Sequence, residues 1–230
     1  MAWTDPIDAY CERLGPGFWA EPLNAWTNLA FLLAAILAFR LWRRLDRRAH
    51  AECRRRDLAS LALVVLVGVI GIGSFLFHTF ADRWSVLADV VPIGIFIYAY
   101  LALALRRFAD LARWKALVAT LLFAGASVLV ETALEPALGG SAAYAPALLA
   151  LFGLGGWLVA TGRRPGRLVL GAGLVFAVSL TLRTLDGPLC ASVPIGTHFL
   201  WHILNAATLG LLLLAAVRQG PRPVKRRITP

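Results

Sequence analysis

Three histidines are the residues of this sequence best suited to chemistry. His78 ends one long apolar stretch, and His198 and His202 begin another in the segment Thr-His-Phe-Leu-Trp-His. Residues four apart on a helix lie on the same face, with Cβ atoms about 6 Å apart. His198 and His202 can therefore offer two imidazoles to one metal ion, and His78 can supply a third. Three protein ligands with a fourth position open for water are typical of catalytic zinc sites, whereas structural zinc sites are closed by four ligands.

The apolar stretches belong to a chain with the composition of an integral membrane protein. Its 230 residues are 59% hydrophobic and only 16% charged, with a mean hydropathy of +0.71. A helix needs about 20 apolar residues to cross the roughly 30 Å of hydrocarbon in a bilayer. The sequence predicts one all-α domain over residues 1–230, a polytopic membrane protein with seven transmembrane helices. These are expected at 23–42, 58–80, 86–105, 115–134, 143–160, 167–185 and 195–217.

The positive charges predict how this domain is oriented. Twenty of the 23 Lys and Arg residues lie in 40–56, 106–115, 163–167 and 218–227, and the remaining three lie in the alternate segments. By the positive-inside rule, segment 1–22 is outside and the basic tail 218–230 is cytoplasmic. The net charge of +10 is thus a topology signal, and we expect no nucleic-acid partner. The tail is expected to anchor the topology, with contact to anionic lipid headgroups as the alternative.

The compartment follows from two further features. The start, Met-Ala-Trp-Thr-Asp-Pro, lacks the basic region and early apolar core of a cleaved signal peptide, so we expect the first span to be retained. Arg outnumbers Lys 21 to 2, a bias that favours a GC-rich bacterial genome. We therefore expect a bacterial inner-membrane protein whose histidines lie near the outer, periplasmic face.

With this orientation, two other polar residues fall at the depth of the histidines. Ser74 lies one turn before His78 on the same face, and Asp89 comes early in the third span. An ionisable residue within a membrane span marks a functional site unless it is paired. Simpler interpretations exist, because a histidine at a span end often makes interfacial hydrogen bonds and a serine bonds to its own helix. The common depth in three helices favours a single site.

The ordered set of motifs resembles the alkaline ceramidases. The motifs are Gly-Ile-Gly-Ser-Phe-Leu-Phe-His at 71–78, Asp89, and His-Phe-Leu-Trp-His at 198–202, with Tyr-Cys-Glu at 10–12 and Ala-Glu-Pro-Leu-Asn-Ala-Trp-Thr-Asn at 20–28. That family belongs to a superfamily of seven-span membrane hydrolases that includes the progestin and adipoQ receptors. The resemblance implies zinc held by the three histidines, with Ser74 and Asp89 beside the metal-bound water. It also implies hydrolysis of the N-acyl amide of a ceramide-like sphingolipid to a fatty acid and a long-chain base.

The residue types suit this reaction. A carboxylate such as Asp89 can take a proton from the attacking water and return one to the leaving amine. A hydroxyl such as Ser74 can donate to the developing oxyanion. The expected partners are the bilayer and a lipid substrate, with no obligate protein partner. Two alternatives stay open: a hydrolase of a different acylated lipid, and a receptor-like or structural protein in which zinc clamps the helices. A fourth protein ligand would favour the clamp.

A calcium site is a further expectation at the N-terminus. Asp8, Glu12 and Glu21 lie in the outer segment, and carboxylate oxygens suit calcium. The resemblance also implies calcium here, with Glu12 and Glu21 matching the family pattern. The sequence departs from that pattern in two ways: Asp8 is one residue further from the Cys-Glu pair, and Leu14 stands where the family tends to have asparagine. The alternative is a solvated acidic cap with an N-terminal turn.

The three cysteines are separated by the predicted topology. Cys11 and Cys190 lie in outer segments, whereas Cys53 lies in the arginine-rich inner loop. Disulfides form in the oxidising outer compartment, and the cytoplasm keeps thiols reduced. We therefore predict a Cys11–Cys190 disulfide and a free Cys53, with two unpaired outer thiols as the alternative. A similar N-terminal cysteine occurs in the ceramidases.

Overall fold

The computed structural model describes residues 2–52 and 55–220, and this part of the chain contains helices but no β-strand. The predicted all-α class is confirmed. The elements are α1 (Pro22–Thr27), α2 (Leu29–Ala51), α3 (Leu58–Phe80), α4 (Arg83–Arg107), α5 (Arg113–Leu138), the 3₁₀ helix η1 (Gly139–Tyr144), α6 (Ala145–Ala160), α7 (Gly166–Leu189) and α8 (His198–Gln219). Cys53 and residues 221–230 of the predicted basic tail lie outside the described residues.

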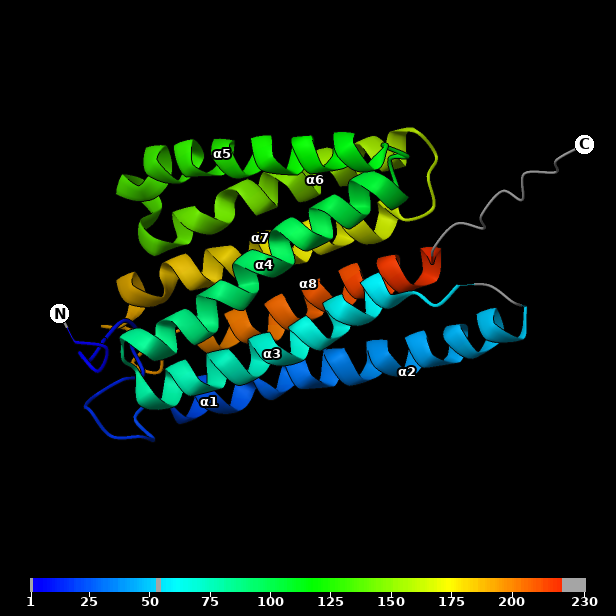
Figure 1. Ribbon diagram of the computed structural model, residues 1–230. Coiled ribbons are helices and arrows are strands. Elements are labelled where there is room, and N and C mark those ends of the chain that lie inside the picture. Colours follow the sequence, from blue (N-terminus) through cyan, green and yellow to red (C-terminus); the bar gives the residue numbers. More distant parts are fainter. Residues whose placement is uncertain (1, 53–54, 221–230) are drawn as a thin grey trace, which may run out of the picture.

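Six helical segments of the described chain are long and apolar enough to cross a membrane, where the sequence predicted seven. The difference lies in Arg113–Ala160, where α5, η1 and α6 form one continuous helical stretch and α6 has only 16 residues. Gly139, with a positive φ of 52°, ends α5 in a conformation that favours glycine. The chain reverses there, so that α5 and α6 run antiparallel (Figure 1).

The first predicted span, 23–42, is also different in detail. The short α1 is followed by α2, which continues through the basic residues as far as Ala51. Arginine, leucine and alanine are strong helix formers, so the charged part of this segment stays helical beyond its apolar part. The helix therefore extends past the stretch that hydropathy alone predicts.

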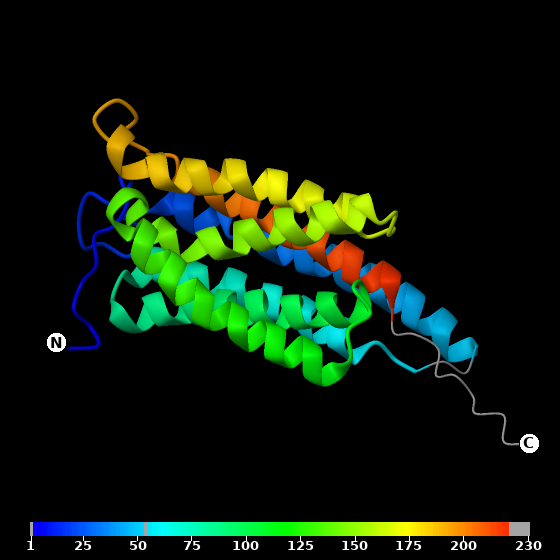
Figure 2. The same cartoon turned by 90° about the horizontal axis from the view of Figure 1, so that it is seen from above.

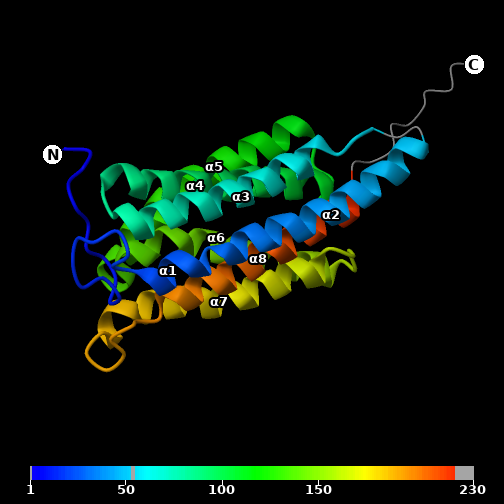
Figure 3. The ribbon, with the colours of Figure 1, turned by 90° about the horizontal axis from the view of Figure 1, so that it is seen from below.

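The last helix, α8, is the centre of the bundle. It lies between α2 and α7 and also contacts α3 (Figure 3). Of its apolar window 61% is buried inside the protein, against 11% for the stretch Arg113–Ala160. The histidines at the start of α8 thus stand on the best-packed helix, whereas α5 presents most of its apolar surface outward.

One end of the bundle gathers the N-terminal segment, the α3–α4 turn and the α7–α8 loop (Figures 1 and 2). We call it the histidine end. The Ile7 backbone N–H donates to the Ala81 carbonyl at 2.7 Å in the α3–α4 turn. A disulfide joins Cys11 to Cys190, with the Cα atoms 5.2 Å apart, as predicted. The N-terminal segment is therefore fastened to two helix pairs.

Candidate metal centre

The three histidines meet at the histidine end. His78 lies in the last turn of α3, His198 is the first residue of α8, and His202 follows one turn later. One ligand atom from each lies within 4.8 Å of the others. The ring centroids are 4.6 Å apart for His78 and His202, 4.7 Å for His198 and His202, and 5.1 Å for His78 and His198. The structure thus brings together the three side chains that the sequence selected.

One nitrogen of each ring has no hydrogen-bond partner. His78 Nε2, His198 Nδ1 and His202 Nε2 are buried and unpaired. All three residues are at most 2% exposed. A buried polar atom without a partner is costly, and three together require an explanation. A metal ion bound by the three nitrogens would pair them all, so these residues fit a zinc ion with three protein ligands.

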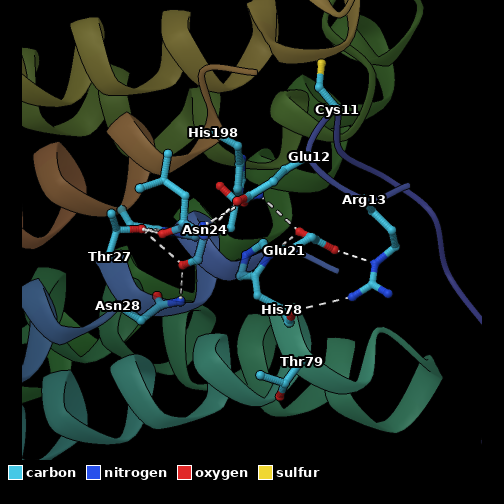
Figure 4. Close-up of polar contacts among 12 residues, drawn as sticks. Cys11, Glu12, Arg13, Glu21, Asn24, Thr27, Asn28, His78, Thr79 and His198 are labelled. Carbon is cyan, nitrogen blue, oxygen red and sulfur yellow. Dashed lines mark hydrogen bonds and ion pairs between the residues drawn. The ribbon is translucent and has the colours of Figure 1, made fainter. Parts of the chain in front are cut away.

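The other nitrogen of two rings is held by a neighbouring side chain. His78 Nδ1 lies 2.6 Å from Glu21 Oε2 (Figure 4), and His202 Nδ1 lies 2.9 Å from Thr27 Oγ1. Such partners are typical of metal-binding histidines, because they fix the ring orientation and the tautomer. Both come from the chain around α1. The short first helix therefore supplies the outer partners of a centre whose imidazoles come from α3 and α8.

Glu21 is itself surrounded by donors. Its Oε1 accepts from Arg13 Nε at 2.5 Å, and its Oε2 also accepts from Asn24 Nδ2 at 3.1 Å. Burial acts to raise the pKa of the Glu21 carboxyl, but the hydrogen bonds from His78, Asn24 and Arg13 outweigh burial and hold the pKa below its usual value. Glu21 is therefore ionised when it faces His78.

His198 is positioned by two residues that sequence reasoning missed. The Tyr10 ring stacks on the His198 ring, with centroids 3.6 Å apart and planes 22° apart. The buried Asp186 accepts from the backbone N–H groups of His198 at 2.8 Å, Thr197 at 2.6 Å and Cys11 at 3.0 Å. Asp186 thus caps α8 and joins it to the disulfide. An acid at the end of a predicted span was the signal that could have identified it.

Ser74 and Asp89 are neighbours across the α3–α4 contact. The Ser74 hydroxyl lies close enough to the Asp89 carboxylate to stabilise its charge, and this carboxylate is close enough to His78 for their charges to interact. Asp89 Oδ1 is buried and has no partner. The two helices approach closely because Gly73 lies against the Ala88 carbonyl. A serine and an acid with an unpaired oxygen therefore lie beside the histidine cluster.

The three predicted calcium ligands do not form one site. Glu12 accepts the Leu23 backbone N–H at 2.6 Å and the Asn24 N–H at 2.8 Å, so it caps α1. Glu21 faces Arg13 and His78, and Asp8 is exposed. Within the described residues, the only other group of metal-binding type is Cys11, Asp186 and Cys190, whose sulfurs form the disulfide. The carboxylates present do not fit a calcium ion.

An apolar pocket begins one turn below the cluster. It is lined by side chains from α3, α4, α5, η1, α6, α7 and α8. Ile70 lies one turn before Ser74, and Asn205 comes three residues after His202, so the pocket opens beside the candidate metal centre. Tyr100 of α4 lines the part of the pocket farther from the histidines, and its hydroxyl is buried without a partner. The lining is mostly apolar.

Compared with models of known protein families and with curated proteins, the chain shows no significant match to any of them.

Proposed function

We propose that the protein is a zinc-dependent amidohydrolase that cleaves the N-acyl amide of a ceramide-like lipid into a fatty acid and a long-chain base. The proposal depends on three buried imidazoles, each of which offers a ligand nitrogen within 4.8 Å of the other two and each of which has an unpaired nitrogen. Among the residues described, this group has three ligand-type side chains rather than four. Three ligands support a site with an open position more than a closed zinc clamp.

The proposal includes seven membrane spans with the N-terminus outside and the C-terminus in the cytoplasm. The reversal of the chain between α5 and α6 supports counting them as two spans (Figure 1). Arg107, Arg113 and Arg163 lie at helix ends away from the histidines, in agreement with a cytoplasmic end. The disulfide at the histidine end suits an oxidising compartment. The active centre would then lie near the periplasmic face of a bacterial inner membrane.

The residues around the cluster can perform the proton transfers of amide hydrolysis. The three histidines would hold a zinc ion, which would lower the pKa of a water to about 7 and polarise the carbonyl. Asp89 Oδ1 is unpaired, so it can accept the proton of the attacking water and then deliver one to the leaving nitrogen. Ser74, next to Asp89, can donate to the oxygen that gains charge. Neither Asp89 nor Ser74 has to move to another part of the protein to take these roles.

The apolar pocket can hold one chain of the lipid. Its walls include Phe96, Phe123 and Leu151 on three different helices. The pocket holds about 60 Å³ of free space, much less than the roughly 300–1,000 Å³ of pockets that take drug-sized ligands. A hydrocarbon chain would therefore enter only as these side chains move apart. The outward-facing position of α5 makes its side of the pocket the easiest to open.

The test is Asp89→Asn in purified full-length protein, followed by zinc content and release of free fatty acid from a panel of ceramides and other acylated lipids. We expect full zinc content and a loss of hydrolysis of about 10²- to 10⁴-fold, the usual contribution of a general acid–base group. Asp46→Asn, which removes the same charge beside Arg56 away from the site, is the control. Wild-type turnover in Asp89→Asn would remove Asp89 from the mechanism.

The same panel separates the alternatives. Fatty acid released from another acylated lipid but not from ceramides would favour a hydrolase of different headgroup specificity. Zinc bound at one ion per chain without hydrolysis of any lipid would favour the receptor-like or structural protein. The unpaired Asp89 oxygen favours the enzyme, because a zinc clamp has no use for it.

A further inference from the structure

A buried arginine, Arg13, lies beside the candidate metal centre. Its Nε lies 2.5 Å from Glu21 Oε1, and the two side chains are only 5% and 3% exposed. Its Nη1 donates to the Gly15 carbonyl at 3.1 Å and its Nη2 to the His78 carbonyl at 3.4 Å (Figure 4). The guanidinium therefore connects the N-terminal segment, Glu21 and the last turn of α3.

A buried carboxylate requires a compensating positive charge. Both oxygens of Glu12 accept hydrogen bonds from the backbone of α1, and Asp8 is exposed. Neither carboxylate is therefore available to bind a divalent ion together with Glu21. The Arg13 guanidinium instead meets Glu21 Oε1 directly, and Glu21 Oε2, which also accepts from Asn24, faces His78 Nδ1 at 2.6 Å. The three groups form a row that ends at the metal centre.

We propose that Arg13 is a built-in cation that replaces calcium: it holds Glu21 in the position that orients His78, and so assembles the zinc site without a divalent ion from solution. Arg13 is a positioning residue, because it acts on the metal centre through Glu21. The inference rests on the proposed zinc site but not on the proposed reaction.

The test measures zinc affinity by competition with a chromophoric chelator, and the visible spectrum after substitution with Co²⁺, in full-length protein. Arg13→Ala is expected to weaken zinc binding about 10- to 100-fold, the usual effect of losing an outer partner of a metal ligand, and to alter the cobalt spectrum. Arg13→Lys should recover part of the affinity. Arg83→Ala is the control, since Arg83 is a half-exposed cation at the same end, 3.8 Å from Asp5, and it should change neither readout.

Calcium and Glu21 complete the test. Removal of calcium should leave the zinc affinity of the wild type unchanged, and in Glu21→Gln the Arg13→Ala change should cost no further affinity. Wild-type zinc affinity in Arg13→Ala, or a tenfold loss in the wild type when calcium is removed, would overturn the proposal. If Arg13→Ala alone fails to fold, the double variant with Glu21→Gln decides the question. A lower zinc affinity in the double variant than in Glu21→Gln would also overturn the proposal. Absence of zinc in the wild type would instead reject the metal centre itself.

A second cation, Arg183, supports an independent inference about the ligand. Its guanidinium lies over the Tyr144 ring at 5.1 Å and the Trp201 ring at 5.6 Å, and Nη1 donates to Ser141 Oγ at 2.7 Å. Its charge also acts on Asp89 in the candidate site. Arg183 thus lies in the last two turns of α7, near the metal centre.

The pairing of Arg183 differs from that of a similar arginine elsewhere. Arg163 lies over the Trp157 ring at 5.1 Å and also pairs with Asp110 at 2.8 Å. No carboxylate of the described chain pairs with Arg183. A charged residue within a membrane span is costly and is retained for a partner or a function. An anion from outside the chain would complete the site.

We infer that Arg183 binds a carboxylate or phosphate carried by the lipid next to the amide that is cleaved, so that acidic N-acyl lipids are preferred. Arginine suits both anions because its planar guanidinium can donate two parallel hydrogen bonds. The inference rests on the proposed hydrolysis of an N-acyl lipid, and it favours a headgroup that carries an acid over the uncharged headgroup of a ceramide. Its test measures binding without turnover.

The probes are N-dodecanoylglycine and its methyl ester, which differ by one charge. The wild-type protein should bind the acid at least tenfold more tightly, by calorimetry in detergent, and Arg183→Gln should bind both alike. Arg163→Gln is the matched control and should keep the preference. Dodecyl phosphate and dodecanoate distinguish a phosphate headgroup from the fatty-acid product. Equal binding of the acid and the ester by the wild type would overturn the inference, and so would an unchanged preference in Arg183→Gln. Binding of both probes, with the acid preferred but neither hydrolysed, would reject only the proposed reaction.

Discussion

The two ends of the bundle each contain a buried arginine–carboxylate pair, and the pairs differ in what else they bind. Away from the histidines, Arg107 forms two parallel hydrogen bonds with Asp57, at 2.8 and 3.0 Å. Its Nη1 also donates to Ser60 Oγ and to the Ala216 carbonyl, each at 2.8 Å. This network joins α3, α4 and α8, and its donors and acceptors are used within the protein.

The pair at the histidine end is open. Arg13 binds Glu21, but Glu21 continues to His78, whose Nε2 has no partner. Buried polar groups in stable proteins are normally satisfied. The contrast therefore separates a structural network, which ends within the protein, from a network whose last atom, His78 Nε2, is buried and unpaired. The open end identifies the functional region better than charge or burial, which the two pairs share.

The largest expected effect is loss of the metal. His78→Ala, His198→Ala and His202→Ala should each reduce zinc from about one ion per chain to almost none, since each removes one of three ligands. Metal analysis of the purified proteins measures this. Arg107→Gln should keep its zinc. Full zinc content in all three histidine variants would remove the difference between the two ends.

The next effect concerns the closed network. Arg107→Gln leaves Asp57 buried without its cation, and breaking a buried pair typically costs about 3–5 kcal/mol. The free energy of unfolding in mixed micelles should fall by that amount, with zinc affinity per folded protein unchanged. A variant as stable as the wild type would show that this network contributes little.

Sequence reasoning found the parts of the site that follow from periodicity. The spacing of His198 and His202 places them on one face of a helix, and matched depth adds His78; all three meet in the structure. It did not find Arg13 or Asp186. Both belong to the site because irregular segments fold back onto helices, and no periodic pattern specifies where such a segment turns. The boundary between α5 and α6 could not be predicted from a periodic pattern either, because it depends on the positive φ of Gly139.

The disulfide is expected to have a smaller effect, confined to the histidine end. Cys11→Ser should lower the free energy of unfolding by about 2–4 kcal/mol, the typical contribution of a disulfide. Because the bond holds the segment that carries Arg13 and Glu21 against the start of α8, zinc affinity should fall as well. Non-reducing peptide mapping of the wild type should yield a linked Cys11–Cys190 peptide, and a crosslink that contains Cys53 would contradict the topology.

The smallest expected change in stability is at Gly73, and it tests the site most locally. A Cβ there would overlap the Ala88 carbonyl, so Gly73→Ala must push α3 from α4. Overpacking of this kind typically costs about 1–3 kcal/mol. Gly94→Ala is the control, because a Cβ at Gly94 meets no atom within 4 Å. Since Gly73 precedes Ser74 and Ala88 precedes Asp89, hydrolysis should fall more than zinc affinity in Gly73→Ala. Equal losses of both would mean that the whole histidine end moves as one unit, and that the contact of Ser74 with Asp89 has no separate role.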